Sequence, residues 1–96
     1  MIASFGDRAT EALYHGRSGR AIRRIPPEIR RIAVRKLDML NAAHSLRDLR
    51  APPGNRLEAL RGNLAGYHSI RINDQWRIVF QWEAHDSHEV RIADYH

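Results

Sequence analysis

The chain contains no cysteine and only one lysine, Lys36, among its 96 residues. The lack of cysteine excludes disulfide cross-links, thiolate-bound zinc and a cysteine nucleophile, and it fits a reducing compartment such as the cytoplasm. No apolar run approaches the roughly 20 residues that a transmembrane helix needs. Residues 1–7 lack the basic segment and apolar stretch of a signal peptide. We therefore expect a cytoplasmic protein that makes no contact with a membrane.

The charge of the chain is basic, with 16 Lys and Arg residues against 11 Asp and Glu, a formal net charge of +5. Apart from Lys36, every basic residue is arginine, whose planar guanidinium matches phosphate oxygens and stacks on bases. The expected partner is therefore a polyanion, whether RNA, DNA or an acidic protein segment. A genome rich in G and C would also favour arginine codons, but it would not account for the net charge.

The length predicts a single domain that spans residues 1–96. Hydrophobic residues make up 43% of the chain and charged residues 28%, which is typical of a folded globular domain. A domain of this size buries only roughly 60–65% of its unfolded surface. Binding of a partner would therefore add usefully to its stability.

The first half of the chain is predicted to be mainly helical. Residues 2–5 are apolar enough for a short edge strand, and Asp7 is a helix cap for a helix that ends near Tyr14. Prolines at 26–27 followed by an acidic residue start a second helix, which runs to about Ala43. Its apolar positions recur at helical spacing: Ile29, Ile32, Ala33, Leu37 and Leu40.

The second half has a period of two, which predicts strands. Candidate strands cover residues 56–61, 67–73 and 76–82, and a final strand follows the turn at 85–87. Alternation places one set of apolar side chains on a single face: Ile70, Ile72, Trp76, Ile78, Phe80, Trp82, Val90 and Ile92. These residues are the expected contact with the helices.

These elements predict an α+β fold, with an N-terminal strand and two helices packed on one face of a mainly antiparallel sheet. The opposite sheet face would present Arg71, Arg77 and Arg91 on adjacent strands. Three arginines on an open face make a candidate phosphate track. The alternative is that they are the ordinary solvated charges of an exposed strand face.

Four stretches of the chain resemble the HigB branch of the RelE toxin superfamily, often called plasmid-maintenance killer proteins. They are IASF at residues 2–5, RLEALRG at 56–62, GYHSIRINDQWRIVF at 66–80 and IADYH at 92–96. The two later stretches are the specific ones, and in order the four span nearly the whole chain. The resemblance implies a RelE-like fold over residues 1–96.

The resemblance also implies an activity. Such toxins enter the decoding site of the ribosome, contact 16S rRNA and cut the exposed messenger RNA without a metal or other cofactor. The ribose 2′-hydroxyl attacks the adjacent phosphate, which leaves a cyclic phosphate and a new 5′-hydroxyl. A helix-turn-helix antitoxin of the HigA kind neutralises the toxin, and operator DNA is bound only through the pair.

The end of the chain holds the candidate acid–base residues, Asp94, Tyr95 and His96. An imidazole titrates near neutral pH, so His96 can take or give a proton. Asp94 lies two residues away and would orient that imidazole in a strand, and Tyr95 would stack on a base or donate a hydrogen bond. The alternatives are a frayed, inert terminal histidine and a tyrosine that only packs.

Two arginines and one glutamate complete the candidate catalytic set. Arg61 matches the position of a basic catalytic residue in related toxins, and Arg77 matches a strand arginine of the wider superfamily, so both are candidates to stabilise the transition state. HigB-type proteins can carry histidine three residues before the position of Arg61, but this chain has Glu58 there. Glu58 would act as the base, or it would simply pair with Arg56.

Further RNA contacts are predicted at five arginines: Arg56, Arg71 and Arg91 in the strand region, and Arg31 and Arg35 on the long helix. The helix would dock on 16S rRNA or meet an acidic antitoxin, and the sequence leaves both open. It also leaves open a basic module that binds RNA or the ribosome without cutting. A DNA-binding repressor is disfavoured because no helix-turn-helix pair is visible.

Two histidine features have plainer interpretations. His68 alternates with Ile70, so we expect it on the core side as a structural residue. His85, Asp86 and His88 have the composition of a metal site, but in a turn such residues are more often simply polar, and no metal is expected.

Overall fold

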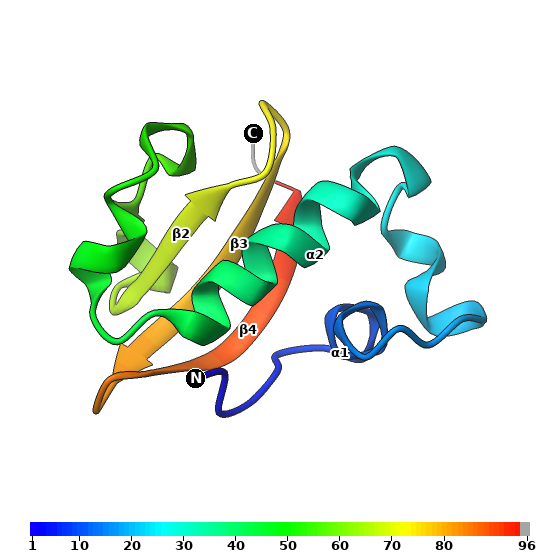
Figure 1. The fold of residues 1–96 in the computed structure, drawn as a ribbon, viewed down its shortest axis with the longest axis horizontal. Coiled ribbons are helices and arrows are strands. Elements are labelled where there is room, and N and C mark those ends of the chain that lie inside the picture. The colour runs from blue at the N-terminus through cyan, green and yellow to red at the C-terminus, as the bar shows by residue number, and fades with distance from the viewer. Residues whose placement is uncertain (95–96) are drawn as a thin grey trace.

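The computed structural model describes residues 1–94 and shows two α-helices on one face of a four-stranded sheet (Figure 1). The helices are α1 (Arg8–Tyr14) and α2 (Pro27–Ala42), and the strands are β1 (Glu58–Ala59), β2 (Tyr67–Arg71), β3 (Trp76–Glu83) and β4 (Asp86–Asp94). The strands pair in chain order and every pair is antiparallel. This arrangement confirms the predicted α+β fold.

Local sequence signals set where both helices begin. The Asp7 carboxylate accepts a hydrogen bond from the Thr10 amide at 2.8 Å, which caps α1. A proline occupies the first turn of α2, followed by the acidic Glu28. In Figure 1, α2 runs diagonally across the sheet. No helix within residues 1–94 has the length and apolar character needed to cross a membrane.

Short 3-10 helices occupy much of the remaining chain. They are Arg20–Arg24, Leu46–Leu49, Pro53–Asn55 and Gly62–Leu64. The second of these is capped by Asp48, whose carboxylate accepts a hydrogen bond from the Ser45 amide at 3.2 Å. The first, which holds three exposed arginines, was not predicted.

The apolar face predicted from alternation forms the core. Ile70, Ile78, Phe80, Val90 and Ile92 are at most 1% exposed and pack against α2 through its buried residues, which are Ile29, Ala33, Leu37 and Leu40. Trp76 and Trp82 stand at the ends of β3 and are only partly buried. Burial of this face is the main source of stability for so small a domain.

The N-terminal segment lies at the edge of the sheet, as predicted, but it does not form a continuous strand. Residues 2–5 lie parallel to β4 but make only two isolated bridges, Ile2 with Ser87 and Phe5 with Val90. Between them Glu89 has a left-handed backbone with φ of 53°, and its amide donates a hydrogen bond to the Ser4 hydroxyl at 2.9 Å instead of to a backbone carbonyl. This irregularity in β4 interrupts the ladder.

The strand predicted at residues 56–61 is also shorter than expected, because β1 contains only Glu58 and Ala59. Arg56 ends the preceding 3-10 helix in a left-handed conformation with φ of 44°, which lies outside the range of regular strand backbone. After Ala59 the chain makes one more backbone bond to β2, from the Leu60 amide to the Tyr67 carbonyl at 2.8 Å. A 3-10 turn then starts at Gly62.

Candidate active site

The sheet face opposite α2, here called the outer face, carries the candidate residues in register. Glu58 lies opposite Ser69, Ser69 opposite Val79, and Val79 opposite Arg91. The next row joins Arg71 to Arg77. Cross-strand partners share a face, so Arg71, Arg77 and Arg91 lie on one face, as alternation predicted.

Arg77, however, is not part of an open phosphate track, because it is only 6% exposed. Its Nε donates to the Ser69 hydroxyl at 2.7 Å, and its Nη2 donates to the Arg56 carbonyl at 2.6 Å. Ser69 is small, so the long Arg77 side chain lies across β2 toward β1 instead of projecting into solvent. The prediction of an exposed Arg77 is therefore wrong.

Glu58 pairs with Arg77 and not with Arg56. One Glu58 carboxylate oxygen lies 3.9 Å from a terminal nitrogen of Arg77, and the Glu58 side chain is 49% exposed. The Arg77 guanidinium is buried, whereas the Glu58 carboxylate is exposed and therefore accessible from solvent. The pairing with Arg56 that the sequence left open is replaced by a pairing across two strands.

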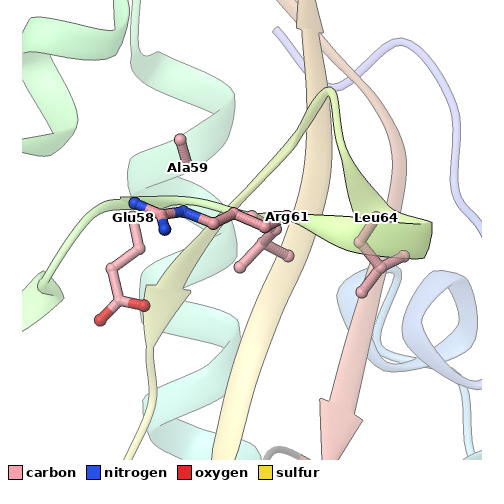
Figure 2. Close-up of a pocket in the computed structure, with 5 residues that line it drawn as sticks. Glu58, Ala59, Arg61 and Leu64 are labelled. Carbon is pink, nitrogen blue, oxygen red and sulfur yellow. The ribbon is translucent and has the colours of Figure 1, made fainter.

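Glu58 and Arg61 line the same open hollow, which has a volume of about 650 Å³. Ala59, Leu60 and Leu64 form the rest of its wall. Figure 2 shows the Arg61 side chain directed back toward Glu58. Arg61 is exposed, so its guanidinium is available to an anion entering the hollow. The structure therefore brings together an accessible carboxylate and an accessible guanidinium.

Asp94 lies apart from this hollow, at the far end of β4. Its register partner is Trp76, on the helix side of the sheet, and its carboxylate accepts a hydrogen bond from Gln75 Nε2 at 3.1 Å. Strands β1 and β4 are three spacings apart, about 14 Å. Asp94 and Glu58 therefore do not meet directly. Tyr95 and His96 lie outside the described residues.

The predicted RNA-binding arginines are divided between two surfaces. Arg71 and Arg91 are half-buried on the outer face, and Arg71 pairs with Asp74. Arg31 and Arg35 are exposed on α2, which covers the helix side of the sheet. The two pairs of arginines therefore lie on opposite sides of the sheet.

Comparison with known proteins decides the family. Residues 3–96 match the sequence model of the family described as the RelE-like toxin of the type II toxin–antitoxin system HigB. The chain belongs to this HigB-like toxin family. It is 46% identical over 82 residues to Toxin HigB-1 of Vibrio cholerae serotype O1, covering 85% of this chain and 84% of that protein.

Other relatives of this HigB-family chain are more distant. An uncharacterised protein of Haemophilus influenzae is 40% identical over 60 residues, which cover 62% of this chain and 59% of that protein. Two solved structures share the fold at low identity. The Staphylococcus aureus YoeB–YefM complex gives a TM-score of 0.54 at 19% identity, covering 100% of this chain and 98% of that chain. The YoeB/ParE toxin of Agrobacterium tumefaciens gives 0.53 at 18%, covering 99% and 98%.

His68 lies on the core side of the toxin, as predicted. Its ring stacks on Phe80 with centroids 6.1 Å apart and planes inclined by 24°. Its Nδ1 is buried and has no hydrogen-bond partner among residues 1–94. Burial lowers the pKa of His68 below its usual 6.5, because the charged imidazolium loses water.

The lowered pKa of His68 predicts a pH-dependent stability. Between the folded pKa and about 6.5 the unfolded chain binds more protons, so the free energy of unfolding falls as the pH drops below about 6.5 and levels off below the folded pKa. Replacing His68 with phenylalanine is expected to flatten this slope in urea unfolding measured from pH 5 to 8. His44→Gln is the exposed control, and an unchanged slope in His68→Phe would contradict the assignment.

The turn that has the composition of a metal site holds its side chains in other contacts. His85 Nδ1 lies 3.2 Å from the His44 carbonyl oxygen, and an Asp86 oxygen lies 3.4 Å from the amino terminus. Across residues 1–94, no three His, Asp or Glu side chains gather closely enough to hold a metal ion.

Sequence reasoning missed three polar residues around β1, namely Lys36, Asn55 and Ser69, all buried. Asn55 receives a hydrogen bond from the Lys36 ammonium and donates from Nδ2 to the Leu49 carbonyl at 3.1 Å. The only sequence signal for Ser69 was the strand alternation that places it on the same face as Arg71. Nothing local marked Lys36 or Asn55, because their pairing joins positions 19 residues apart.

Proposed function

We propose that this HigB-family toxin is a ribosome-dependent endoribonuclease that cuts messenger RNA and so inhibits translation. The observation that supports it is the hollow shared by Glu58 and Arg61 on the outer face of a basic protein. A phosphate in this hollow would meet a cation that binds it and a carboxylate that accepts a proton. These are two of the three functions that cleavage by the 2′-hydroxyl requires.

The proposed roles follow the chemistry. Glu58 takes the proton of the 2′-hydroxyl, and the Arg61 guanidinium stabilises the negative charge that develops on the phosphate. His96 protonates the leaving oxygen, Asp94 orients its imidazole, and Tyr95 stacks on an exposed base. No metal or cofactor takes part.

The proposed partners follow from the family and the charge. A type II toxin acts with an antitoxin, and we propose one of the HigA-like helix-turn-helix kind that carries the operator contacts of the pair. The exposed Arg56 and the outer-face arginines Arg71 and Arg91 contact the messenger, while Arg31 and Arg35 on α2 contact 16S rRNA. The site of action is the cytoplasm.

The decisive test is primer extension on a messenger in a purified translation system, with and without ribosomes. We expect cuts at codon positions only when ribosomes are present, and upstream fragments that end in a cyclic phosphate. Cuts that leave a 3′-hydroxyl would contradict the proposed attack. If translation stops while the messenger stays intact, the protein is not a ribonuclease, and the alternative of a basic module that blocks the ribosome is supported instead.

A further inference from the structure

Strand β1 is too short to fix its own position. It pairs with β2 through only two register positions, Glu58 with Ser69 and Ala59 with His68. It is the edge strand of the sheet, and 3-10 helices flank it on both sides. Yet the hollow is built on this strand, because Glu58 belongs to it and Arg61 follows it by two residues. Something outside β1 must therefore hold it.

One part of the support comes from the outer face. The Arg77 guanidinium donates to the Arg56 carbonyl at 2.6 Å, to the Ser69 hydroxyl at 2.7 Å and to the Ser69 carbonyl at 3.4 Å. Arg56 has a left-handed backbone, a conformation that is strained for a non-glycine residue. A charge-assisted hydrogen bond to its carbonyl stabilises that conformation.

The other part comes from α2. Asn55, directly before Arg56, is fully buried, and its side-chain oxygen accepts a hydrogen bond from the Lys36 ammonium. Lys36 is itself only 9% exposed. Burial, together with the positive charges of Arg35 and Arg71, lowers the pKa of Lys36. A buried ammonium needs its hydrogen-bond partner, so Asn55 is strongly held in place.

We propose that Lys36 and Arg77 are positioning residues that clamp the Asn55–Arg56 turn from two sides and thereby place Glu58 and Arg61 on one phosphate. The inference rests on the proposed function. It gives Arg77 a different role from direct contact with the phosphate, because its guanidinium is engaged with β1 and β2. Glu58 is itself held through the ion pair of 3.9 Å.

Arg77→Lys tests the clamp, because a lysine keeps the charge but loses the planar fork that spans Ser69 and Arg56. We expect kcat for messenger cleavage on ribosomes to fall about 10- to 100-fold while KM changes less than about threefold, since misplaced reactive groups slow the chemical step. Arg50→Ala, which removes an exposed arginine outside the clamp, is expected to leave both constants unchanged.

A double-mutant cycle separates positioning from contact. If Arg77 acts through β1, adding Arg77→Lys to the combined Glu58→Ala and Arg61→Ala background should slow the residual reaction by less than about threefold, because both positioned groups are already absent. Effects that multiply in full would mean that Arg77 stabilises the phosphate independently, and they would overturn the proposal.

Hydrogen exchange at the Leu60 amide tests the clamp without an activity measurement. This amide bonds to Tyr67 and reports whether β1 stays on β2. Arg77→Lys, and Lys36→Met as a second variant, should each speed its exchange about tenfold or more while the β3 and β4 amides change little. Unchanged exchange in both variants would overturn the clamp. If the wild-type protein cuts nothing, the proposed function fails and this measurement still decides the clamp.

Discussion

Replacing Arg61 with alanine is expected to slow messenger cleavage on ribosomes roughly 100-fold or more. Its exposed guanidinium lines the hollow with Glu58, where it would meet the charge that develops on the phosphate. Loss of one such donor typically costs about 100- to 1000-fold in rate. Because the side chain is exposed, stability should change by less than about 0.5 kcal/mol.

His96→Ala belongs in the same experiment, as the test of the proposed acid. Primer extension over time would compare both variants with the wild-type protein and with Arg50→Ala, which removes one positive charge outside the hollow. A matching loss in Arg50→Ala would mean that total charge, and not the hollow, sets the rate. Full activity in Arg61→Ala would remove Arg61 from the mechanism and leave the hollow without a cation for the phosphate.

Replacing Phe80 with alanine is expected to have the largest effect on stability, about 3–5 kcal/mol. Phe80 is the largest fully buried side chain among residues 1–94, and it contacts His68 and Trp82 in the sheet. Domains of this kind are stable by only about 5–15 kcal/mol in total. Thermal unfolding followed by circular dichroism should therefore show a Tm lowered by more than about 10 °C.

Phe80→Leu is the control for this prediction, since it keeps most of the buried volume. We expect it to retain most of the stability that alanine loses, with a cost of about 1–2 kcal/mol. An alanine variant as stable as the wild-type protein would show that the face covered by α2 is not the core on which the fold depends.

Much of the fold could be predicted because its signals are local. Asp7 and the prolines before Glu28 start the helices through contacts within one turn. Alternation over residues 67–92 selects the buried face, since neighbouring side chains of a strand must point to opposite sides. The family was likewise recognisable from contiguous motifs, and the comparisons confirm it.

The candidate site was predictable only as a set of residues. Strand alternation correctly placed Arg77 on the outer face. Whether its side chain is exposed, however, depends on which other groups cover that face. The small Ser69 and the Arg56 carbonyl, 21 positions away, draw the Arg77 side chain inward. Glu58 was left between two roles, because its ion-pair partner comes from a strand two places away in the sheet.

The sequence by itself therefore determined the helix starts, the buried sheet face, the basic charge and the family. Each of these depends on composition or on neighbours within a few residues. Only the tertiary structure decided the length of β1, the burial of Arg77, the pairing of Lys36 with Asn55 and the hollow between Glu58 and Arg61. These features depend on hydrogen bonds and packing between segments brought together by the fold, and spacing along the chain does not encode them.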